Sequence, residues 1–215
     1  MATPKNNVKI KDQAQMRSMT LRSAQQEQKK RLDSECYVEG HAANYETYLL
    51  YDDGDYGKVY ERFEPGCFDE TDLSDVILQF DHAGRVFART TNGTLLVEAD
   101  EAGLFVAADL DKTEGARALY EDIAAQMITK MSWRFCVGKY RIERTEGSKD
   151  ITIVHTKIPK VYDVSAVSFP ANDATEINAR SFGDGVIAAA ARSEAELEEK
   201  RRKLRAKIKI LEVSK

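Results

Sequence analysis

The sequence is poor in cysteine and shows no cysteine pattern. Its three cysteines, Cys36, Cys67 and Cys136, are far apart and form no Cys-x-x-Cys pair. The sequence therefore predicts neither a disulfide framework nor a zinc knuckle, and we expect reduced thiols in a cytosolic setting.

The sequence also lacks long apolar runs and an excess of positive charge. No apolar run approaches the roughly 18–20 residues that span a bilayer, and residues 1–13 lack the apolar stretch of a secretory signal. The 215 residues carry a formal net charge of -4, whereas phosphate contacts need a concentrated cationic face. We therefore expect no membrane partner, no export and no nucleic-acid partner.

The chain divides by composition into three segments. Residues 1–33 are polar and are expected to form an N-terminal arm, partly helical from Ala14 to Arg31. Residues 34–181 alternate short apolar runs with turns and contain one helical pattern, which predicts a mainly β domain of the α+β class. Residues 182–215 combine a linker of small residues with an amphipathic helix that begins at a capping-box pattern.

Hairpin and helix signals lie in the middle of the chain. Asn92-Gly93 is a strong hairpin marker between two apolar runs, and a further turn leads into residues 104–108. These runs together predict a three-stranded meander. Thr113 is expected to cap a helix that carries apolar residues at i+4 spacing and ends near Lys130.

Ser132 and His82 are the main candidates for chemistry. His82 follows an apolar run and lies in an Asp-His-Ala-Gly turn. A histidine in this position is either a positioned general base or a turn residue that bonds only its local surroundings. Ser132 lies between the predicted helix and a strand in which Trp133 and Phe135 alternate onto the opposite face. On these residues alone, Ser132 is either a surface hydroxyl or a rigidly held nucleophile. The absence of a Gly-x-Ser-x-Gly pattern argues against an α/β-hydrolase.

Asp163 and His155 are candidates for a third role. Asp163 lies in a predicted strand, where its carboxylate either faces outward or orients an imidazole, and His155 in the preceding strand is the alternative. A metal site would need the three histidines to converge with a carboxylate, and no two of them have the spacing of a His-Glu-x-x-His site. We therefore predict no metal and no cofactor.

Several blocks of sequence occur in an order that is typical of one family. They are Arg17-Ser18, Val38 to Ala42, Tyr60 to Phe68, His82, a meander with Asp100 and Gly103-Leu104, Met131 to Phe135, and Tyr162 to Ala171. In this order they resemble the HK97-like prohead proteases, the peptidases with which phages trim capsid and scaffold proteins. The resemblance covers roughly residues 17 to 180.

The resemblance implies a fold similar to that of herpesvirus assemblins, a closed or partly closed β-barrel ringed by helices. It matches Ser132 to the nucleophile and His82 to the base. Asp163, where the family commonly has Glu, becomes the third catalytic member, with His155 as the alternative. The chain departs from the family pattern at Arg134, which replaces a glycine and is a candidate oxyanion helper.

The resemblance also implies a function. It indicates a serine endopeptidase that works through an acyl-enzyme and cleaves the major capsid protein or scaffold chains, and itself, during prohead maturation. The expected setting is the host cytoplasm, inside the assembling prohead, and the expected state is a homo-oligomer. A non-enzymatic capsid-assembly scaffold or docking module is the alternative function, and a metallohydrolase is the third.

Overall fold

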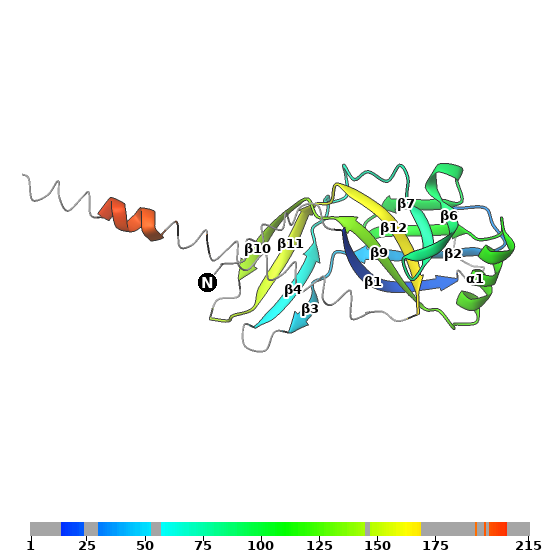
Figure 1. The fold of residues 1–215 in the computed structure, drawn as a ribbon, viewed down its shortest axis with the longest axis horizontal. Coiled ribbons are helices and arrows are strands. Elements are labelled where there is room, and N and C mark those ends of the chain that lie inside the picture. The colour runs from blue at the N-terminus through cyan, green and yellow to red at the C-terminus, as the bar shows by residue number, and fades with distance from the viewer. Residues whose placement is uncertain are drawn as a thin grey trace, which may run out of the picture. The chain divides into compact units, whose positions relative to one another are not determined.

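Strands β1 to β12 and helix α1 belong to the first of two compact units of the computed structural model, residues 1–179 and 180–215 (Figure 1). The structure describes residues 14–23, 30–52, 57–144 and 147–168, and residues 192, 196 and 198–205 of the second unit, which are helical. The expected boundary at residues 181/182 and the expected capping box lie outside these described residues. No described helix is long and apolar enough to cross a membrane.

The larger sheet has eight strands. In spatial order they are β6 (Ala83–Arg89), β5 (Ile77–Phe80), β12 (Lys160–Val167), β9 (Lys130–Cys136), β1 (Ala14–Ser23), β2 (Tyr37–Asn44), β8 (Gly103–Asp109) and β7 (Leu95–Ala99). β6 and β7 stand at opposite ends of this order, yet only residues 90–94 join them along the chain. The sheet therefore has to curl until its two edges approach each other.

The observed class is mainly β with helices, as the sequence predicts. Within the described residues, however, the ladder of hydrogen-bonded strands runs from β6 to β7 without a pairing of β6 with β7. A curled sheet of this kind is open at one seam. Full closure into a barrel is not confirmed and stays a prediction.

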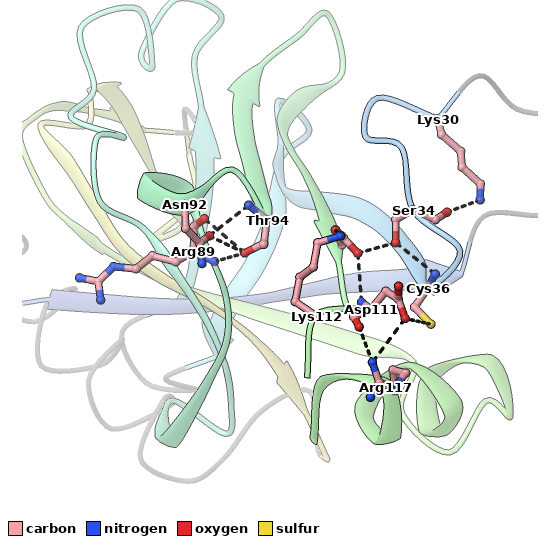
Figure 2. A network of polar contacts seen from close by, with 10 residues as sticks. Lys30, Ser34, Cys36, Arg89, Asn92, Thr94, Asp111, Lys112 and Arg117 are labelled. Carbon is pink, nitrogen blue, oxygen red and sulfur yellow. Dashed lines mark hydrogen bonds and ion pairs between the residues drawn. The ribbon is translucent and has the colours of Figure 1, made fainter. Parts of the chain in front are cut away.

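The expected three-stranded meander is wrong at its first strand. β7 and β8 pair antiparallel, but β6 pairs with β5. A 3-10 turn at Thr90–Asn92 and Gly93, with φ 74°, joins β6 to β7. Thr94 Oγ1 donates to Asn92 Oδ1 (2.6 Å) and accepts from the Arg89 N–H (2.9 Å) (Figure 2). These side-chain bonds turn the chain without a hairpin ladder, because Asn-Gly marks a turn but does not decide which strands pair.

Residues 14–23 form a central strand, so the expectation of a partly helical arm is wrong over this segment. β1 lies between β2 and β9 and pairs antiparallel with both. Its backbone N–H and C=O groups thus find partners on two sides, which outweighs a polar composition that would not order the segment alone. The partner β9 is distant in sequence, so a local pattern does not indicate it.

Ser34 ties the segment before β2 to the end of β8. Its Oγ donates to Asp109 Oδ1 (2.5 Å) and accepts from the Cys36 N–H (3.1 Å), and Lys30 Nζ donates to its carbonyl (2.7 Å) (Figure 2). Lys112 Nζ lies 2.8 Å from Asp109 Oδ2. Burial raises the pKa of Asp109, but the bonds from Lys112 and Ser34 outweigh burial, and the net pKa is lowered. The charged carboxylate therefore anchors the segment.

Helix α1 (Glu114–Ala124) begins where the sequence predicts. Thr113 Oγ1 accepts from the Ala116 N–H (3.2 Å), which confirms the cap. The helix ends earlier than expected, at Ala124 and not near Lys130. Gln126 adopts the left-handed region with φ 60°, and this turn ends the helix.

An aromatic cluster fills the core between the larger sheet and a second sheet. In spatial order the second sheet consists of β10 (Lys139–Arg144), β11 (Ile151–Lys157), β4 (Lys58–Phe63) and β3 (Tyr48–Asp52). Trp133 and Phe135 of β9 are fully buried, with ring centroids 4.2 Å apart, and Phe63 lies 5.4 Å from Trp133. The predicted alternation of β9 is confirmed. Its other face is left to Ser132 and Arg134.

Candidate active site

Ser132 is held on an interior strand. It is the third residue of β9, and its neighbours in register are Ser18 of β1 and Ser165 of β12. Its side chain lies on the face opposite the aromatic cluster, and the residue is 4% exposed. Because β9 is paired on both sides, the position of the Ser132 hydroxyl is fixed by two ladders.

His82 lies in the turn between β5 and β6. Asp81 and His82 both adopt the left-handed region, with φ 48° and 56°, which is uncommon and costly for residues other than glycine. Three backbone N–H groups donate bonds that hold this turn: Asp81 N–H to Ala166 O (2.9 Å), Ser168 N–H to Asp81 Oδ1 (3.0 Å) and His82 N–H to Ser165 Oγ (3.2 Å). The carboxylate of Asp81 thus bonds Ser168, and the imidazole takes its carboxylate partner from elsewhere.

The side chains of Ser132, His82 and Asp163 form a continuous row of hydrogen bonds. His82 Nε2 lies 2.7 Å from Ser132 Oγ, and His82 Nδ1 is hydrogen-bonded to Asp163 Oδ1. The side chain of His82 is 11% exposed and that of Asp163 is 3% exposed. The row therefore runs from a buried carboxylate through the imidazole to the hydroxyl, and it joins β12, the β5–β6 turn and β9.

Asp163 is fixed by two side chains besides the imidazole. Ser165 Oγ donates to Asp163 Oδ1 (3.1 Å), and Arg134 Nε lies 3.4 Å from Asp163 Oδ2. Arg134 Nη2 also donates to the His82 carbonyl (3.4 Å). The guanidinium thus compensates the buried charge of Asp163 and braces the His82 backbone. Its expected role as oxyanion helper stays a prediction.

Sequence analysis missed Ser165, although a signal was present. Asp163 and Ser165 are two residues apart in a predicted strand, so they face the same side of the sheet. A buried hydroxyl beside a buried carboxylate is a natural hydrogen-bond donor to it. The register that places Ser165 opposite Ser132 was not visible in the sequence, because it depends on the bulge in β12.

The other two histidines have carboxylate partners of their own. His155 Nε2 lies 2.8 Å from Glu61 Oε1, and both residues are fully buried. The His155 ring stacks on Phe63 at 4.9 Å, within the aromatic cluster. His41 Nε2 lies 3.0 Å from Asp100 Oδ1. The structure thus separates the three histidines, and the described residues contain no group of three or more side chains suited to a metal ion.

The geometry around Ser132 suits nucleophilic catalysis. An imidazole within hydrogen-bond reach of a hydroxyl can take its proton, and a carboxylate on the far ring nitrogen fixes the tautomer in which the near nitrogen is free to accept. His155 bonds Glu61 and lies on the aromatic face of β9, whereas this row lies on the opposite face. Arg134 contacts both Asp163 and the His82 backbone.

Comparison with known proteins places the chain in a family. The family model described as caudovirus prohead serine protease matches residues 23–186. No curated protein matches the chain. Among solved structures, the bacteriophage T4 capsid assembly protease gp21 matches over 74% of this chain and 98% of its own, with 11% sequence identity and a TM-score of 0.39. Because the family model matches most of the length of this chain, the chain belongs to the caudovirus prohead serine proteases.

Proposed function

We propose that the protein is a serine endopeptidase with Ser132 as nucleophile, His82 as general base and Asp163 as the residue that orients the imidazole and stabilises the imidazolium that forms. The observation that carries this proposal is the row of hydrogen bonds from Asp163 Oδ1 through both nitrogens of His82 to Ser132 Oγ, 2.7 Å from Nε2. Membership of a serine protease family supports it independently.

The proposed reaction proceeds through an acyl-enzyme. Neutral His82 takes the proton of Ser132 through Nε2 while Oγ attacks the peptide carbonyl, and the imidazolium then gives that proton to the leaving amine. Water then attacks the acyl carbonyl and gives a proton to His82, and His82 returns that proton to Ser132 Oγ as the acid leaves, which restores both residues. Asp163 accepts from Nδ1–H throughout and stabilises the imidazolium, and Arg134 offsets the carboxylate charge in the resting enzyme.

The proposed substrates are capsid or scaffold chains of an immature phage head, and the protease itself. The family's association with proheads supports this choice. The proposed place of action is the assembling prohead within the host cell. A homo-oligomer and a closed or partly closed barrel are further parts of the proposal, and the approach of the two edges of the larger sheet supports the latter.

Co-expression of the protein with its capsid partner tests the proposal. Mass spectrometry should find trimmed capsid chains with the wild type and none with Ser132→Ala, since loss of a nucleophile lowers kcat on the order of 10⁶-fold. Ser148→Ala is the matched control, because Ser148 is an exposed serine in the turn between β10 and β11. Normal trimming by a folded Ser132→Ala protein would exclude Ser132 as nucleophile.

A fluorophosphonate probe separates the peptidase from the alternative functions. The probe should label wild type at Ser132 and leave Ser132→Ala unlabelled, because only an activated hydroxyl attacks phosphorus readily. A non-enzymatic scaffold would not be labelled at all. A metallohydrolase would lose activity with a chelator, whereas labelling of a serine peptidase should be unaffected by one.

A further inference from the structure

We propose that Ser165 is a positioning residue that holds His82 and Asp163 in one rigid unit. The inference rests on the proposed function, since it assigns a role within the same site. It concerns a buried hydroxyl that does not contact the reacting atoms. Its role is to hold the His82 backbone and the Asp163 carboxylate in place relative to each other.

Ser165 bonds both His82 and Asp163. Its Oγ accepts from the His82 N–H (3.2 Å) and donates to Asp163 Oδ1 (3.1 Å). Ser165 is fully buried and lies opposite Ser132 in the pairing of β12 with β9. A fully buried hydroxyl that makes both bonds is a fixed reference point, because no water competes for it.

These contacts close a ring of hydrogen bonds. From Ser165 Oγ the ring runs to the His82 backbone nitrogen, along the His82 side chain to Nδ1, across to Asp163 Oδ1 and back to Ser165 Oγ. Backbone, imidazole and carboxylate therefore cannot shift independently. A single hydroxyl sets the place of His82 relative to Asp163.

The backbone of His82 needs such support. With φ 56°, the residue occupies a region that non-glycine residues adopt only when the surroundings hold them there. The bond from Asp81 to the Ala166 carbonyl fixes the preceding residue, and the bond to Ser165 fixes His82 itself. Loss of the Ser165 hydroxyl would free the His82 N–H and let the turn relax.

Ser165 is distinct from the nucleophile by its bonds. Its proton is directed at Asp163, and its acceptor side is occupied by a backbone N–H. Of these two serines, Ser132 is the one that bonds His82 Nε2. Ser165 therefore acts through His82 and Asp163, and its removal should slow the reaction without removing the nucleophile.

Thr94 provides a matched control for this role. Its hydroxyl is also buried, accepts from a backbone N–H (Arg89, 2.9 Å) and donates to a side chain (Asn92, 2.6 Å), but it lies in the β6–β7 turn (Figure 2). Thr94→Val and Ser165→Ala thus remove the same two kinds of bond from two places. A purely structural role would lower the melting temperature of both variants alike and leave labelling unchanged.

The experiment measures the second-order rate of fluorophosphonate labelling at Ser132, with thermal melts of each variant. We expect Ser165→Ala to be labelled about 10- to 100-fold more slowly than wild type, the cost of misplacing a catalytic group by a fraction of an ångström to an ångström. Thr94→Val should be labelled at the wild-type rate. Ser165→Cys, whose side chain is slightly larger and keeps a weaker donor, should be intermediate.

The outcomes separate the two proposals. If wild type is labelled and folded Ser165→Ala is labelled equally fast, the positioning role is wrong and the proposed function stands. If Ser165→Ala does not fold, Ser165→Cys decides in the same way. If wild type itself is not labelled, the proposed function is wrong, and the role of Ser165 is overturned with it.

Discussion

Replacing Asp163 by Asn tests the orientation of His82 without changing the size of the side chain. In the structure, Asp163 Oδ1 meets His82 Nδ1, and Oδ2 lies 3.4 Å from Arg134 Nε. A guanidinium only donates hydrogen bonds, so the carbonyl oxygen of Asn has to face Arg134. The amide NH₂ then faces His82 Nδ1, while the Ser165 hydroxyl can rotate to accept from it as well.

This arrangement inverts the tautomer of His82. The amide donates to Nδ1, so the ring proton moves to Nε2, the atom that faces Ser132 Oγ at 2.7 Å. A protonated Nε2 cannot accept the serine proton. Loss of the corresponding carboxylate in a serine-protease triad lowers kcat about 10⁴-fold, equivalent to about 5 kcal/mol of transition-state stabilisation.

Single-turnover cleavage of a capsid substrate measures the effect. We expect a loss of that size in kcat with KM little changed, because the Asp163 side chain is 3% exposed and is not placed to touch substrate. Asp75→Asn is the control, since Asp75 is an exposed carboxylate that bonds Arg89. A wild-type rate in folded Asp163→Asn would refute the tautomer argument. A larger loss in folded His155→Ala would make the triad Ser-His-His.

Two further substitutions test stability. His155→Ala should lower the free energy of unfolding by about 3–5 kcal/mol, because it removes one partner of a fully buried pair with Glu61. It should leave kcat of the folded protein unchanged, as denaturant titration and kinetics will show. Asp109→Asn should cost roughly 1–3 kcal/mol at pH 7, because the carboxylate bonds Ser34 and Lys112. The pKa of Asp109 is lowered by folding, so its contribution is present above the unfolded value of about 3.9 and is lost as pH falls through the folded value. The difference in unfolding free energy between the two proteins should therefore shrink as pH falls below about 3.9. A difference that stays constant from neutral pH into acid would contradict the assignment.

Local chemistry made part of the site predictable. The alternation of β9 indicated that Ser132 would face away from Trp133 and Phe135, and the structure agrees. The turn signal at Asp81-His82 also corresponds to a turn, although its left-handed backbone was not indicated by any glycine at these positions. Whether the two residues meet is not a local property, and only the family resemblance suggested it.

Strand pairing explains what the sequence did not reveal. The segment that became β1 has an ordinary local pattern, but its partner β9 lies far along the chain. β6 pairs with the strand before it, β5, and not with the strand after the turn signal. Asn92-Gly93 marks a turn in either arrangement, so it suggested a hairpin where the structure has the joint between two sheet edges. The sequence did not indicate the role of Ser165 for a related reason: the pairing of β12 with β9 places Ser165 opposite Ser132, and this register is not a local property.

The place of β1 has a consequence for the timing of activity during translation. The strand that carries Ser132 is enclosed by an early segment, residues 14–23, on one side and by a late one, residues 160–167, on the other. Pairings between such distant segments form slowly because the intervening loop must close first. A ribosome therefore has to release nearly the whole of the first unit before β9 has both of its neighbours. Under the proposed function, a nascent chain cannot cleave other proteins until then.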